Sequence, residues 1–358
     1  MKKFLVLAMA SVMTLSFGML SACVGPLDKG GVNDDGTIDG TYEEVTKEDL
    51  SETLSAVTVS TMIGDTEAAG WALHLGAKAG GEISVTIGSG AAATGISAAF
   101  DADGAFSLNK DEETDEILPL GISLGINECD LSITGADATQ GSAQGSVYLA
   151  PDGTVYADLN LKSGEDELAL KGKETLSSLA AFLGGMMPGP SASAFAEQTL
   201  PDTGNTDGSQ SVQIADVLTL GTIVEMLAQY DVKAELDDSD GYVFRFTASY
   251  QALASILGET GSVPVSFTEG SVTLYLSLDE SYALRAVSAV ADLTGSMEAS
   301  AATSFPGITF DADVTLSLSV KEQTAVEVPS DLDSYTKGII EQLFGSAPMP
   351  GIEADTAL

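Results

Sequence analysis

Hydrophobic and polar residues alternate over most of the chain, which is the pattern of strands with one buried face. Residues 71–75 and 83–87, for example, carry an apolar side chain at every second position. Turn sequences such as the Pro-Asp-Gly at 151–153 follow at short spacing and favour hairpins between neighbouring strands. The pattern therefore predicts antiparallel pairing, without the long helices between strands that a parallel sheet needs.

Two runs of such segments are expected. The first occupies about 71–75, 83–87, 93–100, 104–108, 119–127, 129–134, 145–150, 154–162 and 166–171. The second occupies about 232–237, 241–248, 263–268, 271–278, 282–293, 295–302, 308–319 and 324–328. Turns rich in Asp and Gly are expected within them at 101–104 and 238–241, because these residues tolerate the backbone angles of a tight turn.

A helix is expected before the first run of strands. Residues 46–57 begin with a threonine that can cap the helix, and Asp49 follows three positions later. Leu50, Leu54 and Val57 then recur on one face of the predicted helix. This face is expected to pack on the concave side of a curved sheet and to border any apolar cavity.

A second helix, at about 215–230, is expected before the second run of strands. Its apolar face, like the first, is expected to line any cavity: Val217, Val224 and Leu227. Shorter helices are expected at about 173–183, at 250–257 and after Tyr335.

The order of a helix followed by a meander thus occurs twice and sets the expected organisation. The segments are 1–22 (signal peptide), 23–44 (acidic flexible tether), 45–187 (helix and meander), 188–210 (linker or long loop), 211–334 (second helix and meander) and 335–358 (tail). The predicted fold class is α+β and β-rich, with an antiparallel, half-barrel-like curved sheet and a few helices on its concave face. One enlarged sheet and two half-barrels both agree with this pattern.

The first residues have the three parts of a secretory signal. Lys2 and Lys3 precede the apolar run 4–20, and small residues stand before Cys23. The order Leu-Ser-Ala-Cys resembles the bacterial lipobox, which implies cleavage before Cys23 and attachment of lipid to its thiol. Two or three acyl chains on one residue suffice for stable anchoring. We therefore expect a lipoprotein held at the bacterial cell membrane or outer membrane, facing the periplasm or the exterior.

Charge and cysteine content narrow the choice of partners. The formal net charge is −39 at pH 7, and it becomes more negative by two when the signal is removed. Such a polyanion is repelled by the phosphates of nucleic acids, so no nucleic-acid partner is expected. Once Cys23 carries lipid, Cys129 has no partner within the chain, and no disulfide framework is expected.

The order of elements resembles the half-barrel lipoproteins, namely the LolA and LolB carriers of Gram-negative bacteria and the mycobacterial glycolipid-binding LppX and LprG. The closing Val-Glu-Val-Pro at 326–329, followed by Tyr335, is similar to their last strand. In those families a curved antiparallel sheet wraps around helices and can leave a cavity for acyl chains. The resemblance concerns architecture, so it transfers no binding residue to this sequence.

No catalytic or cofactor site is expected. Ser123 lies in a Gly-x-Ser-x-Gly sequence, but the single histidine, His74, precedes it, and the segment continues as a strand. Residues 33–39 resemble part of a calcium-binding loop but lack both terminal acidic ligands, which favours a solvated tether. The sequence therefore favours a non-catalytic, lipid-anchored envelope protein with a binding or structural role. The alternative is a carrier or sensor of lipid or another apolar ligand.

Overall fold

The computed structural model describes most of the chain between residues 31 and 344. The described residues are 31–179, 220–221, 230–260, 265–298 and 307–344, without 56, 67, 69, 91–92, 112, 115, 136–137 and 325. They form one mostly antiparallel sheet of 13 strands together with a few short helices. The predicted β-rich class with antiparallel meanders is therefore confirmed.

Two meanders make up almost all of the sheet. The first contains β2 (Ala72–Ile87), β3 (Thr94–Lys110), β4 (Ile117–Thr134), β5 (Thr139–Leu149), β6 (Thr154–Ser163) and β7 (Asp166–Thr175). The second contains β8 (Val232–Asp237), β9 (Tyr242–Ser249), β10 (Val265–Leu278), β11 (Leu284–Met297) and β12 (Ile308–Lys321). The two-residue strands β1 (Glu43–Glu44) and β13 (Lys337–Gly338) lie at the two edges.

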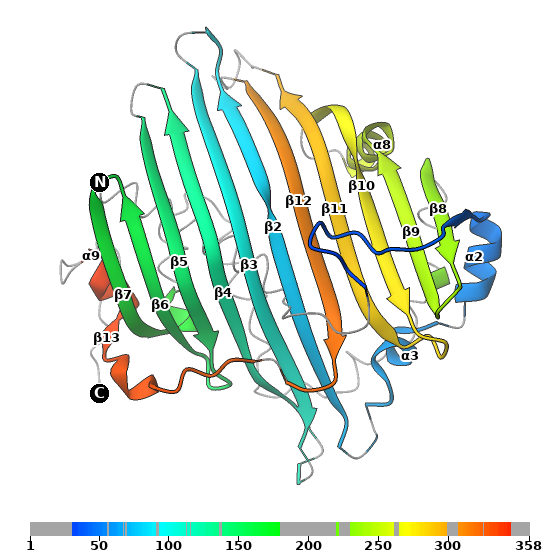
Figure 1. Ribbon diagram of the computed structural model, residues 1–358, viewed down its shortest axis with the longest axis horizontal. Helices are drawn as coiled ribbons and strands as arrows, with labels where there is room; N and C mark the ends of the chain where they lie inside the picture. The colour runs from blue at the N-terminus through cyan, green and yellow to red at the C-terminus, as the bar shows by residue number, and fades with distance from the viewer. Residues whose placement is uncertain are drawn as a thin grey trace.

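The two meanders are joined edge to edge. β12 pairs antiparallel with β2 over fourteen residue pairs, from Ile308 opposite Ile87 to Lys321 opposite His74. The strand order is β1-β8-β9-β10-β11-β12-β2-β3-β4-β5-β6-β7-β13, so the second meander precedes the first across the sheet (Figure 1). The chain therefore builds one large open sheet. β8 is the next described strand after β7 in the sequence, but the two lie near opposite edges of the sheet.

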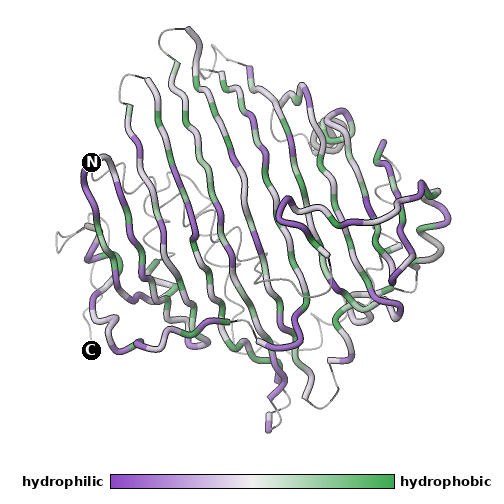
Figure 2. Tube along the Cα trace, viewed as in Figure 1, coloured by the Kyte–Doolittle hydropathy of each residue, from purple (hydrophilic) through white to green (hydrophobic). Residues whose placement is uncertain are grey.

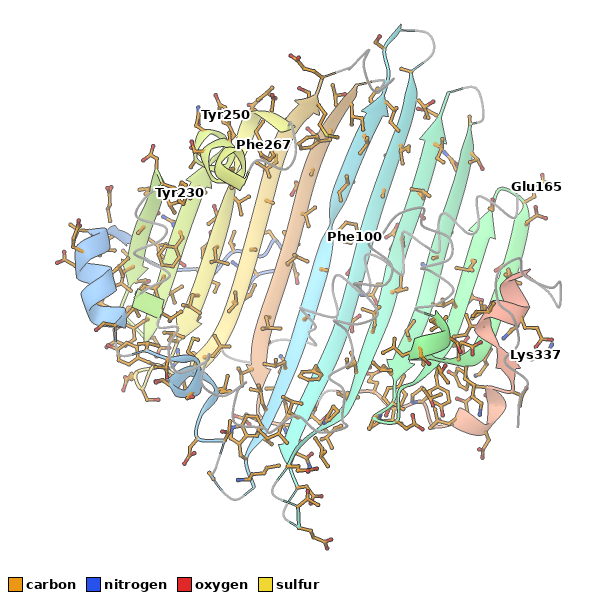
Figure 3. The ribbon with its side chains drawn as sticks, turned by 180° about the vertical axis from the view of Figure 1, so that it is seen from behind. Phe100, Glu165, Tyr230, Tyr250, Phe267 and Lys337 are labelled. Carbon is orange, nitrogen blue, oxygen red and sulfur yellow. The ribbon has the colours of Figure 1, made fainter. Side chains whose placement is uncertain are left out.

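The sheet has two chemically different faces. Residues paired across strands share a face, and hydropathy alternates along each strand (Figure 2). The concave face is the more apolar, and it carries the helices α2 (Lys47–Leu54), α3 (Val59–Ile63), α8 (Tyr250–Thr260) and α9 (Ile339–Phe344), as seen from behind in Figure 3. We call the opposite face the strap face, because two segments cross it. These are the N-terminal strap, residues 31–42, and the C-terminal strap, residues 322–336.

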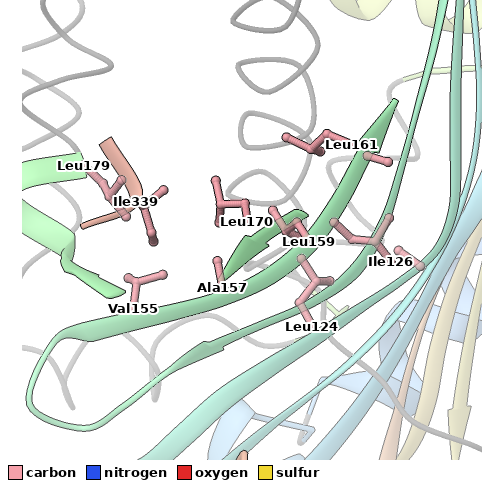
Figure 4. Close-up of a cluster of buried hydrophobic side chains, with 11 residues drawn as sticks. Leu124, Ile126, Val155, Ala157, Leu159, Leu161, Leu170, Leu179 and Ile339 are labelled. Carbon is pink, nitrogen blue, oxygen red and sulfur yellow. The ribbon is translucent and has the colours of Figure 1, made fainter. Parts of the chain in front are cut away.

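Two clusters of buried apolar side chains fill the two ends of the concave face. Figure 4 shows one of them inside the curve of the strands, and its buried members include Leu124, Ile126, Leu159, Leu161, Leu170, Leu179 and Ile339. In the other cluster, side chains from α2, from Val57 just after it and from α8 cover β8, β9 and β10. Its buried members include Leu50, Leu54, Val57, Phe244, Phe246, Leu276 and Leu278. Burying large apolar side chains contributes about 1.5–3 kcal/mol each. The helices therefore hold the two ends of the sheet.

Local sequence signals predicted three of the helices and the turn at 151–153. The Oγ1 of Thr46 accepts a hydrogen bond from the Asp49 N–H at 3.2 Å and donates to the Asp49 carboxylate at 2.6 Å, which is the predicted cap of α2. The turn at 151–153 is closed by hydrogen bonds such as Gly153 N–H to the Ala150 carbonyl at 3.0 Å. The predicted helices near 250–257 and after Tyr335 are confirmed as α8 and α9.

The predicted turn at 101–104 is wrong, because these residues lie inside β3. Ala102 is buried on the concave face, whereas Asp101 and Asp103 alternate with it and point to the strap face. Here the alternation of side chains between the two faces was the better guide to structure than the presence of turn-forming Asp and Gly residues. Several strands that were predicted as two pieces are likewise continuous, with β-bulges where a break was expected: within β3 and β4 near Asp101 and within β10 near Phe267.

Two further predicted elements are corrected at their ends. Residues 324–328 form no strand, because they cross the sheet as part of the C-terminal strap and bond to side chains of Ser107 and Ser123. The helix predicted from Lys173 begins at Leu176 instead, because Lys173–Thr175 finish β7 in register with β6. The predicted linker 188–210 and most of the predicted helix 215–230 lie outside the described residues.

The tether prediction is corrected for residues 31–44. Val32 and Ile38 are 6% and 4% exposed and pack against Tyr275 and Ala286 on the strap face. The Oγ of Ser288 also donates a hydrogen bond to the Gly36 carbonyl at 2.5 Å. Two buried apolar residues and a hydrogen bond from the sheet thus hold this acidic segment on the strap face.

Candidate binding faces of the sheet

The residues predicted to border a cavity fall into two groups. Leu50, Leu54 and Val57 are 2%, 0% and 1% exposed and pack on the concave face as predicted. Core side chains such as Phe244 and Leu278 surround them. The other predicted lining residues, Val217, Val224 and Leu227, lie outside the described residues, as does Cys23. A cavity beside these helices therefore stays a prediction.

The described strands bring together a different apolar surface between the two core clusters. In one row across the sheet, Val272, Ala291, Val314, Gly81, Phe100 and Cys129 stand opposite one another on successive strands β10, β11, β12, β2, β3 and β4. The adjacent row contains Leu293, Ala312, Ile83, Ala98 and Leu131. We call these two rows the concave band.

The concave band is apolar and only partly buried. Apart from Phe100, which is 7% exposed, its side chains have intermediate exposure, unlike the fully buried residues of the two core clusters. Several members are small, including Ala291, Ala312, Ala98 and Gly81. Small side chains on the inside of a curved sheet leave room for an apolar group, so the band is suited to contact hydrocarbon rather than to perform chemistry.

Cys129, Ser123 and His74 are the residues with catalytic potential that the sequence singled out, and all three lie within strands. Burial, with a smaller contribution from the charge of Asp130, raises the pKa of the Cys129 thiol, which disfavours the reactive thiolate. Ser123 is 9% exposed, and its Oγ accepts a hydrogen bond from the Glu327 N–H at 3.1 Å, which holds the C-terminal strap. His74 lies on β2 beside Ser107 and Lys321, in register with strand residues. The predicted strand role of Ser123 is confirmed.

The N-terminal strap is tied to the edge of the sheet by a charged cluster. Glu235 of β8 is 6% exposed, and its carboxylate accepts hydrogen bonds from Arg245 Nε and Lys233 Nζ, both at 2.8 Å. The Arg245 hydrogen bond, followed in importance by that of Lys233 among the favourable contacts, lowers the pKa of Glu235. The Arg245 guanidinium also lies 4.0 Å from the ring centre of Tyr42, and burial raises the pKa of Tyr42 to about 12.

The C-terminal strap is fixed by a second polar cluster. Lys171 Nζ of β7 contacts Asp331 at 2.7 Å and Asp158 at 3.1 Å, and hydrogen bonds to both carboxylates raise the pKa of Lys171. Tyr335 is 3% exposed, with its ring edge-on to Tyr156 at 5.4 Å between ring centres. The strap therefore spans the first meander and ends against β6 and β7.

Two hollows open on the strap face. The first has a volume of about 520 Å³ and is lined mainly by hydroxyl, amide and charged groups, including Glu82, Ser97, Asp130, Gln140 and Lys162. The second, of about 660 Å³, lies beside the N-terminal strap and is lined among others by Ile38, Asp39, Asp237, Ser277 and Arg285. Charged and polar side chains line both hollows, and no aromatic ring is among their lining residues to stack on a sugar.

The strap face is also strongly acidic. Asp292, Asp313 and Glu82 stand directly opposite one another on three adjacent strands, and all three are exposed. Like charges in register repel, so this face would repel a polyanion such as a nucleic acid.

Oxygens of Asp35, Thr37 and Asp39 in the calcium-like sequence are used within the N-terminal strap itself. The Asp35 carboxylate accepts hydrogen bonds from the Thr37 N–H at 3.0 Å and from Thr37 Oγ1 at 2.7 Å, which lower its pKa. Asn33 Nδ2 donates to Thr37 Oγ1 and to Asp39. Within the described residues, no three His, Cys, Asp or Glu side chains are grouped to hold a metal ion.

Comparison with protein-family models and with curated proteins finds no match for this chain. The described helices include none that is both long and apolar enough to cross a bilayer. The role of the two faces of the sheet therefore has to be inferred from their own geometry.

Two features of these faces were not predicted from the sequence: the straps and the concave band. Val32 and Ile38, separated by six positions in an acidic segment, were the only local signal for the N-terminal strap. The band left no local signal, because its rows depend on the register of six strands.

Proposed function

We propose that this chain is a lipid-anchored, non-catalytic protein of the bacterial cell envelope with a binding or structural role. Lipid on Cys23 attaches it to the membrane, and the curved sheet is the scaffold that meets its partners. The feature that most supports this proposal is the seating of the N-terminal strap on the sheet.

The strap limits how far the sheet can stand from the membrane. Seven residues lie between Cys23 and Gly31, so the eight Cα–Cα steps of a fully extended chain would reach about 28 Å. Because the strap is fixed from Val32 onward by burial and hydrogen bonds, the anchor acts on the body of the sheet. A binding or structural protein held close to a bilayer suits this arrangement, and the Ser123 hydroxyl is used to hold the C-terminal strap.

Replacing Cys23 with Ser tests the anchor. Cys23→Ser should move the protein from the membrane fraction to the soluble fraction of the periplasm or medium, because the thiol that receives the lipid is gone. Cys129→Ser is the matched control and should stay with the membrane. Membrane retention of Cys23→Ser equal to that of the unaltered protein would contradict the proposal.

A role as a carrier or sensor of lipid or another apolar ligand is the second candidate, and the concave band favours it. The band offers contiguous apolar side chains of intermediate exposure, several of them alanines, which fill little space. Acyl chains are the ligands that such a surface fits, since they need apolar contact and no hydrogen bonds.

Lipid occupancy tests this second candidate. Protein lacking residues 1–23 should carry host acyl lipids through a native purification, detected by mass spectrometry. Val314→Trp fills the band and should lower the lipid per protein, whereas Thr309→Trp, on the exposed opposite face of the same strand, should not. Lipid-free protein, or equal occupancy in both variants, would count against the carrier role.

A further inference from the structure

Three of the four large apolar residues that the described structure leaves exposed lie at one corner of the sheet. Ile117, Leu118 and Leu120 are 43%, 40% and 38% exposed, and together with Pro119 they form a continuous run at the start of β4. The fourth, Val328 of the C-terminal strap, is 55% exposed. Consecutive exposed apolar residues are unfavourable for a soluble surface unless they contact something.

The same run has an unpaired backbone edge in the described structure. β4 pairs with β3 along residues 117–121, but β5 pairs with β4 only from Ile122 onward. The β3–β4 hairpin therefore extends past its neighbour at the lower end of the sheet (Figure 1). An extended peptide can add to such an edge through main-chain hydrogen bonds, with its side chains in alternate positions giving specificity.

The C-terminal strap brings Val328 to the same side of the sheet. Thr324 and Glu327 are held by Ser107 and Ser123 on the strap face. Leu118 stands opposite Asn109, two residues from Ser107, so its side chain is on that face as well. The corner thus combines an open edge with exposed apolar side chains, and Val328 lies on the same face of the sheet as Leu118.

The charge of the β3–β4 turn distinguishes between the partners that could bind this edge. Asp111 caps the turn by accepting hydrogen bonds from the N–H groups of Glu113 and Thr114, and Glu113 and Glu116 are exposed. A bilayer entered turn-first would receive these carboxylates before Ile117, which is costly. A second copy of the chain would bring another net charge of −39, which opposes its approach to this acidic turn.

We propose that the edge at Ile117–Gly121, together with Val328, is a docking surface for an extended segment of another protein. This segment has apolar residues at alternate positions and Lys or Arg at the end beside the acidic turn. This docking surface specifies the partner of the proposed binding role. It rests on that role for the cellular location in which the partner is found. The docking surface itself is a property of the folded sheet.

An array of nine-residue peptides tests the chemistry of the partner. Its members alternate apolar and Thr residues and carry two Lys or two Glu at either end; binding to the full chain in mild detergent is measured by fluorescence anisotropy. Lys-terminated peptides should bind about tenfold more tightly than their Glu-terminated counterparts, as expected for charge complementarity across one interface. The amides of residues 117–121 should become protected from hydrogen exchange on binding.

Variants of the corner separate docking from nonspecific attraction. Leu118→Asp should abolish binding, and Glu113→Lys combined with Glu116→Lys should reverse the preference toward Glu-terminated peptides. Ala169→Asp is the matched control at the exposed edge strand β7 and should leave binding unchanged. Circular dichroism confirms that each variant is folded, and Val328→Asp supplies a second test at a position outside the strands.

Three outcomes would overturn the inference. One is the absence of charge-dependent binding across the array, and another is equal binding by Leu118→Asp and Ala169→Asp. The third is a different occupant: self-association, or sedimentation of the Cys23→Ser chain with phosphatidylcholine vesicles, that Leu118→Asp abolishes. None of these results bears on the membrane fractionation of Cys23→Ser, so failure of the docking surface and failure of the anchor are distinguishable.

Discussion

Glu235 shows how a single residue ties distant segments together. Its buried carboxylate is held between Lys233 and Arg245, and the Arg245 guanidinium in turn stacks on Tyr42 of the N-terminal strap. A buried charge is stable only when such partners satisfy it. The polar cluster therefore connects strap, edge strand β8 and the neighbouring β9.

Replacing Glu235 with Gln should destabilise the fold in a pH-dependent way. At pH 7 the free energy of unfolding should fall by about 2 kcal/mol, because both cations lose a charged acceptor. The pKa of Glu235 is lowered in the folded state, so its contribution is present above the unfolded pKa of about 4.3 and is lost as the pH falls through the folded value. Urea unfolding at several pH values should show the difference between wild type and Glu235→Gln shrinking below about pH 4.

Asp34→Asn is the control for this comparison. It removes a carboxylate whose side chain is 98% exposed and whose partner is Lys78, so solvent screening should leave the stability nearly unchanged. A difference between wild type and Glu235→Gln that stayed constant down to pH 3 would mean that folding does not lower the pKa of Glu235.

At the scale of elements, the two straps are what distinguish this sheet from a plain meander. Each crosses the strap face without joining it as a regular strand, and each relies on a few buried anchors: Val32 and Ile38 in one, Tyr335 in the other. Side chains of the sheet, such as Ser288 and Ser123, satisfy backbone groups of the straps. The straps are therefore specified by small numbers of residues spread over several strands.

Tyr335→Ala should release the C-terminal strap. Loss of a buried aromatic ring packed on Tyr156 should lower the free energy of unfolding by about 3 kcal/mol and speed proteolytic cleavage within residues 322–336. Asp333→Ala, at an exposed position in the same strap, should change neither quantity. Limited proteolysis with mass spectrometric mapping measures the effect, and equal cleavage of both variants would argue against Tyr335 as the anchor.

At the scale of the whole molecule, the seam between β12 and β2 joins two meanders that the chain order keeps apart. Fourteen residue pairs run along it. The large buried clusters lie on either side of the seam, one at each end of the sheet, while the concave band crosses it. Each half thus has much of its own core but lacks a partner for one long edge strand.

Separating the halves should expose these edges. Fragments ending at residue 187 or beginning at residue 211 should each aggregate when produced alone, because β2 or β12 would present a long unpaired edge. Producing both fragments together should restore soluble protein that elutes as a complex in size-exclusion chromatography. A soluble monomer of either fragment with cooperative thermal unfolding would show that the seam is dispensable.

Local chemistry made much of the strand layout, several turns and α2 predictable from the sequence. The alternation of side chains, the turn at 151–153 and the Thr46 cap depend on residues within a few positions of one another. The burial of Leu50, Leu54 and Val57 followed from the same helical period. The proposed lipid site at Cys23 is likewise indicated by a short contiguous motif.

Only the tertiary structure decided which strands meet. Pairing β12 with β2 brings together residues more than 200 positions apart, and the competing arrangement of two half-barrels has the same local pattern. The concave band and the exposed corner at Ile117 follow from that register and from where β5 ends, while the straps depend on side chains of several strands. A one-dimensional pattern states which face of a strand is apolar; it does not state its neighbour, because many apolar strands satisfy that face equally well.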